Sequence, residues 1–264
     1  AGPNGPGGPG GPVVPSRGRL RPLTLAEVGV RGGFWRPRQA VNGSVTLDHA
    51  LTWMERVGWV DNFRTVAAGR PLDERGGREF SDSEIYKLME ALAWEVGRSG
   101  SADAEAAIQM LAATIGAAQQ PDGYLSTAFG QPGQRARYSD LEWGHELYCH
   151  GHLIQAGVAR ARASGQDEAF QIARRAADHV CREFGPGGNE GLCGHPEIEM
   201  ALVELARVTG EQRYLDQAAL FVERRGHGRL GEIPLGPAYF QDDIPVREAS
   251  VLRGHAVRAL YLAA

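Results

Sequence analysis

The stretch 151-GHLIQAGVARARASG-165 has a counterpart further along the chain, 194-GHPEIEMALVELARVTG-210. Both segments begin with Gly-His, continue through an apolar helical pattern and end at Ala-Arg-x-Ser/Thr-Gly. Each is followed by a second stretch with helical spacing, and a third Gly-His helix starts at 254-GHAVRALYLA-263. Repeated helical hairpins of this kind are typical of α/α solenoids and toroids, in which one helix of each pair faces inward. The repeat therefore predicts an all-α fold with a histidine near the start of several inner helices, all facing one cavity.

Helical spacing of apolar residues continues outside this repeat, and strand-like alternation is limited to fragments at 230–240. The Gly- and Pro-rich residues at the start of the chain can bury almost nothing, which predicts a disordered tail over 1–19. Residues 20–264 are expected to form one domain of helical hairpins, an α/α solenoid or toroid. Together with the helices of the repeat, helices are expected at 45–57, 82–97, 103–119, 141–163, 167–183, 196–208, 211–224 and 247–263.

Composition excludes several classes of function. The chain has 264 residues and a net charge of −4, which argues against a nucleic-acid-binding surface. It contains no apolar run long enough to cross a membrane. Its three cysteines, Cys149, Cys181 and Cys193, are an odd number without close spacing, and no signal peptide precedes them. These features favour the cytoplasm, and they give no indication of the oligomeric state.

The segment 145-HELYCHGH-152 raises the question of a metal site. On a helix, His145, Cys149 and His152 share one face at positions i, i+4 and i+7, which suits zinc, with Glu146 beside them as a base. A packed helix face with one or two pocket histidines is the alternative. The other two Gly-His helices carry no cysteine at the matching position, so we favour a cavity histidine and predict no metal in this chain.

The candidate substrate-binding residues are His145, His195, His255, Asp82 and Trp143. His195 precedes a proline that suits the first turn of a helix, which places it at a helix mouth. Trp143 lies just before His145 and could stack on a sugar face. For Asp82, a simple N-cap is the alternative.

Other notable side chains are expected to be structural. Trp53, Tyr86 and Trp94 occur at helical spacing and are predicted to belong to the core. Glu197 and Glu199 are expected to complement the dipole of a helix N-terminus.

With these residues in view, the chain strongly resembles the glycoside hydrolase family 127 (GH127) β-L-arabinofuranosidases. The similar stretches occur in the expected order and cover almost everything after the Gly/Pro tail. They are 34-FW-35, 60-VDNF-63, 82-DSEIYKLME-90, 118-AQQPDGYLSTAF-129, 145-HELYCHGHLIQAGVA-159, 194-GHPEIEMALVEL-205, 209-TGEQRYLD-216 and 241-QDDIPVREASVLRGHAVRALYL-262.

The resemblance implies an (α/α)6 barrel followed by β-rich domains, and retaining hydrolysis of β-L-arabinofuranosyl linkages. It also implies that His145, His195 and His255 hold the sugar. In this family the nucleophile is a zinc-bound cysteine thiolate, and a glutamate is the general acid/base. Zinc keeps such a thiolate deprotonated, and a covalent intermediate divides hydrolysis into two easier displacements.

The sequence departs from the family where this chemistry is concerned. The family's Glu-x-Cys and Cys-Cys motifs and its acid/base glutamate lie downstream of the Gly-His-Ala-Val helix, whereas this sequence stops at Ala264 and has no cysteine after Cys193. We therefore expect an incomplete barrel that binds a small or oligosaccharide substrate but has no catalytic residue and no cofactor of its own. His150 and Asp243 also differ from the usual family residues, and His150 is expected to face solvent or to lie behind the pocket.

Three functional hypotheses remain open at this stage. The chain can be part of a zinc-dependent arabinofuranosidase, or a non-catalytic carbohydrate-binding α/α domain. It can also be a hydrolase of another toroid type with Asp82 and Glu146 as acid and base.

Overall fold

The computed structural model describes residues 23–25, 27–70, 75–231 and 234–264. The tail predicted over 1–19 lies outside these residues. In the order of the chain, the elements are α1 (Trp35–Val41), the π-helical turn η1 (Asn42–Thr46), α2 (Leu47–Arg56), α3 (Trp59–Ala67), α4 (Ser81–Ser99), α5 (Ala102–Ala118), α6 (Glu146–Ala163), α7 (Glu168–Phe184), α8 (Ile198–Thr209), α9 (Gln212–Arg224), the 3₁₀ turn η2 (Pro237–Phe240) and α10 (Ala256–Ala263). The part of the chain described here contains no β-strand, so the predicted all-α class is confirmed.

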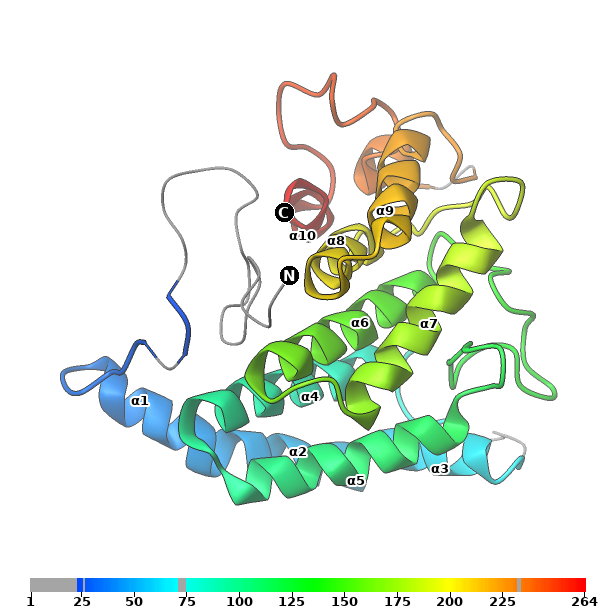
Figure 1. Ribbon diagram of the computed structural model, residues 1–264. Helices are drawn as coiled ribbons and strands as arrows, with labels where there is room; N and C mark the ends of the chain where they lie inside the picture. The colour runs from blue at the N-terminus through cyan, green and yellow to red at the C-terminus, as the bar shows by residue number, and fades with distance from the viewer. Residues whose placement is uncertain (1–22, 26, 71–74, 232–233) are drawn as a thin grey trace.

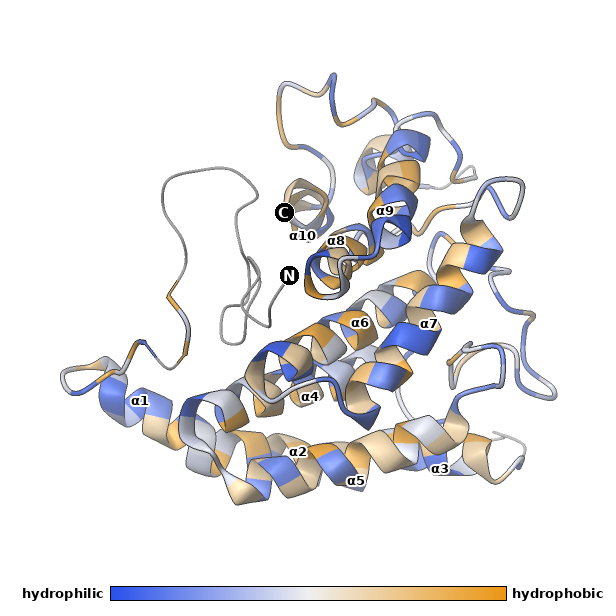
Figure 2. Cartoon of the chain, in the orientation of Figure 1, coloured by the Kyte–Doolittle hydropathy of each residue, from blue (hydrophilic) through white to orange (hydrophobic). Residues whose placement is uncertain are grey.

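The helices from α4 onward form two layers (Figure 1). In the inner layer α4 packs on α6, α6 on α8, and α8 on α10, while in the outer layer α5 packs on α7 and α7 on α9. Each inner helix is joined to the outer helix that follows it. The hairpins α6–α7 and α8–α9 are those predicted from the repeat, and α4–α5 adds a third hairpin of the same design. Polar and apolar residues alternate along α7 and α9 (Figure 2), as expected of outer helices that bury one face.

Helix α6 lies at the centre of this arrangement and is buried on nearly every side. It can approach its neighbours closely because small residues line it. A Cβ atom placed on Gly157 would lie 2.4 Å from the Cβ of Ala173 in α7, and one on Gly151 would lie 2.5 Å from Cγ of Glu197. Both glycines are therefore required for the close contacts of α6 with α7 and with the segment that enters α8.

Several helix ends follow the expected capping chemistry. Ser101 Oγ accepts a hydrogen bond from the N–H of Ala104 at the start of α5. Helices α4 and α8 end at Gly100 and Gly210, whose φ angles of 69° and 75° are in the left-handed region that favours glycine.

The structure corrects some expected boundaries. The helix predicted at 141–163 begins only at Glu146, because 141–144 form a turn and His145 is left-handed, with φ of 59°. The helix predicted at 247–263 is confined to α10, and the short strand fragments at 230–240 are replaced by η2 where the residues are described. Helix α3 was not predicted.

One prediction of side-chain environment is wrong. Trp53 is 48% exposed on α2 and does not belong to the core, whereas Tyr86 is fully buried as expected. For His150 the structure excludes exposure to solvent, one of the two expected environments, because the long segment between α5 and α6 covers that face of α6 with Tyr124 and Tyr138.

Candidate functional site

Three histidines, His145, His195 and His255, meet at one end of the inner layer. His145 is the N-cap of α6, His195 lies three residues before α8, and His255 is the N-cap of α10. The ring centroids of His145 and His195 are 6.0 Å apart, and those of His195 and His255 are 6.5 Å apart. Since α6, α8 and α10 are successive inner helices, their N-terminal ends place three imidazoles side by side.

Burial holds the first two histidines in the neutral form. His145 and His195 are 9% and 8% exposed. Desolvation lowers the pKa of His145, and it lowers the pKa of His195 to about 3. Both rings are therefore neutral near pH 7, and each has one protonated and one unprotonated ring nitrogen.

Backbone contacts decide which nitrogen carries the proton. The Nδ1 of His195 lies 2.8 Å from the carbonyl oxygen of Pro196, and the Nδ1 of His145 contacts the carbonyl oxygen of Trp143. A carbonyl oxygen accepts only, so Nδ1–H is the donor in both rings and Nε2 remains an acceptor.

His255 has the opposite tautomer. Its Nδ1 accepts a hydrogen bond from the N–H of Arg258 at 3.4 Å, which leaves the proton of the neutral ring on Nε2. The three rings together provide two acceptors and one donor. Such a set suits vicinal hydroxyl groups, because each hydroxyl can donate one hydrogen bond and accept others.

Aromatic side chains that the sequence analysis did not single out surround these histidines. The Tyr148 ring lies between His195 and His152, with centroid distances of 4.5 Å and 4.6 Å. Tyr261 of α10 lies 5.2 Å from His195, and Tyr239 of η2 lies 5.3 Å from His255. For Tyr148, the only sequence signal was its position one turn after His145 on the predicted inner helix.

Trp143 lies at the edge of this group, where it is 38% exposed. Its ring centroid is 6.0 Å from that of Tyr239 and 5.0 Å from that of Phe240. The guanidinium of Arg258 lies 5.5 Å from the Trp143 ring and 4.8 Å from the Tyr239 ring. This packing fixes Trp143 and leaves part of its surface open beside the histidines.

Asp82 is not part of the histidine group. It lies in the first turn of α4, where the N-cap is Phe80, and it is 2% exposed. Arg75 Nη2 donates to its Oδ1 at 2.9 Å, while the backbone N–H and hydroxyl of Thr127 donate to its two oxygens at 2.7 Å and 2.5 Å. These bonds tie the loop before α4 to the segment after α5.

Glu146 also has its own partners, on the face of α6 away from the histidine group. The hydroxyl of Tyr124 donates to one carboxylate oxygen, and the N–H of Tyr138 donates to the other at 2.7 Å. Burial raises the pKa of Glu146 to about 7 in spite of these hydrogen bonds. A raised pKa suits a general acid, but both carboxylate oxygens are engaged within the protein.

The residues of the possible zinc site do not fit that metal. Cys149 Sγ lies 3.8 Å from the carbonyl oxygen of Phe80, and burial raises the pKa of its thiol well above the usual value. His152 turns toward Glu197 and His145 toward the Trp143 carbonyl. Within the described ranges no three His, Cys, Asp or Glu side chains converge as a metal site would require.

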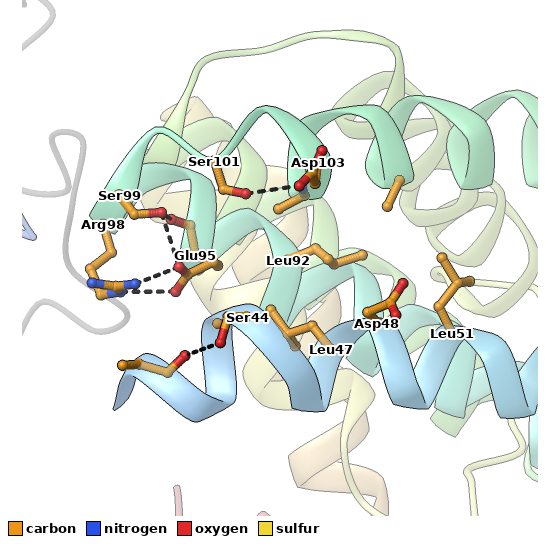
Figure 3. Close-up of a pocket in the computed structure, with 14 residues that line it drawn as sticks. Ser44, Leu47, Asp48, Leu51, Leu92, Glu95, Arg98, Ser99, Ser101 and Asp103 are labelled. Atoms are coloured by element: carbon orange, nitrogen blue, oxygen red, sulfur yellow. Dashed lines mark hydrogen bonds and ion pairs between the residues drawn. The ribbon is translucent and has the colours of Figure 1, made fainter. Parts of the chain in front are cut away.

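A cavity of about 610 Å³ lies elsewhere, between η1, α2, α4 and α5 (Figure 3). Two of its charged groups are engaged with each other, since Arg98 donates to Glu95 at 2.8 Å, and Ser99 donates to the same carboxylate at 2.9 Å. Asp48 and Asp103 also line it, but none of the sequence-predicted site residues does. We place the candidate site at the three histidines.

Comparison with known proteins identifies the family of the chain. The profile of the β-L-arabinofuranosidase GH127 catalytic domain matches residues 27–264. The chain belongs to glycoside hydrolase family 127. It is 37% identical, over 219 residues, to a non-reducing end β-L-arabinofuranosidase of Bifidobacterium longum, an alignment that covers 75% of this chain and 33% of that protein.

Solved GH127 structures have the same helical arrangement. A β-L-arabinofuranosidase from Geobacillus stearothermophilus superposes with a TM-score of 0.81 at 34% identity, covering 89% of this chain and 40% of that one. Another GH127 β-arabinofuranosidase has the same TM-score at 32% identity and covers 90% and 38% of the two chains. The chain thus spans between one third and two fifths of the length of these relatives.

Proposed function

We propose that this chain is the sugar-binding part of a β-L-arabinofuranosidase, and that His145, His195 and His255 hold a terminal arabinofuranosyl residue. The observation that supports this most directly is the convergence of three imidazoles whose backbone contacts assign complementary tautomers. It combines with the family membership of the chain and with the activity of its relatives.

In this proposal the histidines bind and orient the sugar rather than react with it. The Nε2 atoms of His145 and His195 accept hydrogen bonds from two sugar hydroxyls, and the Nε2–H of His255 donates to a third oxygen. Trp143 stacks on an apolar sugar face at the edge of the site. In the full-length enzymes of the family, bound zinc would keep a cysteine thiolate ionised so that it can act as the nucleophile. No described residue of this chain has the role of that nucleophile.

The experiment is a titration of the chain with L-arabinose and with methyl β-L-arabinofuranoside, followed by calorimetry or ligand-observed NMR. Loss of one buried hydrogen bond is worth roughly 1 kcal/mol, so we expect alanine at His145, His195 or His255 to weaken binding about fivefold or more. The control is His227→Ala, because His227 is exposed and its side chain lies outside the group. Equal affinity in all four variants would refute the assignment.

The same chain tests the two other hypotheses. A non-catalytic binding domain would bind the furanoside but release no aryl group from an aryl glycoside. A hydrolase that used Asp82 and Glu146 would cleave the aryl glycoside by itself and lose that activity in Glu146→Gln. The hydrogen bonds that occupy both carboxylates do not favour this third hypothesis.

We also propose a cytoplasmic location. It is supported by three cysteines that form no disulfide among the described residues. Among those residues no helix combines the length and the apolar character that a bilayer crossing requires.

A further inference from the structure

Beneath the three-histidine site, a second pair of titratable side chains is fully enclosed. Glu197 is 0% exposed and His152 is 6% exposed. The Nδ1 of His152 lies 3.3 Å from Oε1 of Glu197. Apart from this approach, neither ring nitrogen of His152 and neither carboxylate oxygen of Glu197 has a hydrogen-bond partner among the described residues.

The cost of such an arrangement depends on the charge of the pair. An ionised carboxylate and an imidazolium would each need several further hydrogen bonds to offset the loss of water, and none is available here. A protonated carboxyl group that donates to an unprotonated imidazole nitrogen needs only one. Burial accordingly raises the pKa of Glu197 and lowers that of His152 to about 3, and both shifts favour the uncharged forms.

The groups that face this pair from the neighbouring helices are few. Lys87 and Glu90 lie on α4, Tyr148 on α6, His195 and Glu199 at the start of α8, and Tyr261 on α10. Lys87 is bonded to Glu84 and Glu90 to Trp94, so neither one neutralises the pair directly.

The pair is connected to the sugar site in two ways. First, the Tyr148 ring packs edge-on against His152 on one side and at a tilt against His195 on the other. Second, Glu197 belongs to the same short segment as His195. That segment lies directly on the backbone of α6, where a Cβ on Gly151 would be 2.5 Å from Cγ and 3.0 Å from the carbonyl carbon of Glu197.

We propose that Glu197 and His152 form an uncharged acid–imidazole pair that positions His195 and Tyr148 for sugar binding. The carboxyl O–H of Glu197 donates a hydrogen bond to Nδ1 of His152, which fixes the ring against which Tyr148 packs. The pair makes no contact with the sugar itself, so both are positioning residues. This inference rests on the proposed function for its role in binding, whereas the protonation of the pair stands independently.

The test compares Glu197→Gln with Glu197→Leu in the full chain. An amide N–H replaces the carboxyl O–H as donor, so Gln preserves the proposed contact, whereas Leu removes it. The control is Glu90→Gln, which changes a half-buried carboxyl group that faces the same interior but is bonded to Trp94. Circular dichroism establishes that each variant is folded.

Two measurements decide the outcome. Nitrogen-15 NMR of the histidine rings should show His152 with Nδ1 unprotonated from pH 5 to pH 8 in the wild-type chain and in Glu197→Gln. The His195 signals should shift in Glu197→Leu but not in Glu90→Gln. Affinity for methyl β-L-arabinofuranoside should change less than twofold in Glu197→Gln and weaken about fivefold in Glu197→Leu.

A doubly protonated His152 ring at pH 7 would overturn the proposal, and so would equal effects of Gln and Leu at Glu197. If the wild-type chain binds no furanoside, the proposed function fails and the positioning role fails with it. The His152 tautomer then still decides whether the pair is uncharged. If Glu197→Leu fails to fold, unchanged affinity and tautomer in Glu197→Gln support the uncharged pair, and loss of either refutes it.

Discussion

Replacing Glu146 with glutamine should change how the stability of the fold depends on pH. Glu146 is 4% exposed, and burial raises the pKa of its carboxyl group from 4.5 to about 7. Its charged form is therefore less favourable in the folded chain than in the unfolded chain. The stability associated with the protonated carboxyl is fully present below pH 4.5 and is lost as the pH rises through about 7.

The size of this change in the free energy of unfolding follows from the shift in the pKa of Glu146. A difference of one pKa unit corresponds to about 1.4 kcal/mol, so a shift from 4.5 to about 7 corresponds to about 3 kcal/mol. Glutamine resembles the protonated carboxyl in shape and has no charge to lose. Relative to the wild-type chain, Glu146→Gln should be nearly neutral at pH 4.5 and more stable by up to about 3 kcal/mol at pH 8.5.

The assay is urea unfolding of both chains at several pH values, followed by circular dichroism. The relevant quantity is the difference in the free energy of unfolding between the two chains, because buried histidines contribute the same pH dependence to both. A difference that stays constant from pH 4.5 to pH 8.5 would show that Glu146 does not have a raised pKa. A difference that falls with pH would show that Tyr124 and Tyr138 stabilise the carboxylate more than burial destabilises it.

Three further predictions concern the buried polar groups. Burial lowers the pKa of His150 from 6.5 to about 3, so stability that is present above pH 6.5 is lost as the pH falls toward 3. Glutamine does not take up a proton in this range. In urea unfolding, His150→Gln should therefore reduce the decrease in the free energy of unfolding at acid pH by about 4 to 5 kcal/mol. Glu204→Leu removes the carboxylate that lies 2.5 Å from Arg162 in a buried pair, and it should lower the free energy of unfolding by about 3 to 5 kcal/mol. The chain should bind no stoichiometric zinc by elemental analysis, and one zinc per chain that disappears in Cys149→Ser would contradict this.

The Gly-His repeat was sufficient to predict the hairpins α6–α7 and α8–α9 and the helix of each pair that faces inward, because a repeated hairpin stacks in only a few ways. The resemblance to the GH127 family, rather than the repeat, singled out His145 together with His195 and His255. Periodicity could not locate the start of α6, because the turn over 141–144 is held by contacts distant in the sequence, such as the hydrogen bond from the N–H of Gly194 to the carbonyl oxygen of Leu141.

The environments of His150 and Glu197 could not be predicted for a related reason. His150 points away from the inner face of α6, a direction that normally means solvent, but the segment with Tyr124 and Tyr138 folds back over it. Glu197 was expected to be a helix-dipole carboxylate because acidic residues are common in first turns. Its burial results from the close approach of α6 and the entry segment of α8 at Gly151, which no local pattern encodes.

Helix α6 links two of the buried polar groups described above. Its inner face carries Tyr148 and His152 below the three candidate histidines, whereas its opposite face carries Glu146 and His150. Glu146 directly follows His145, so ionisation of its carboxyl above about pH 7 weakens the first turn of the helix whose N-cap is His145. The low pKa values of His152 and His195 keep these two rings neutral down to about pH 3. The first turn of α6 is therefore more sensitive to alkali through Glu146 than His152 and His195 are to mild acid.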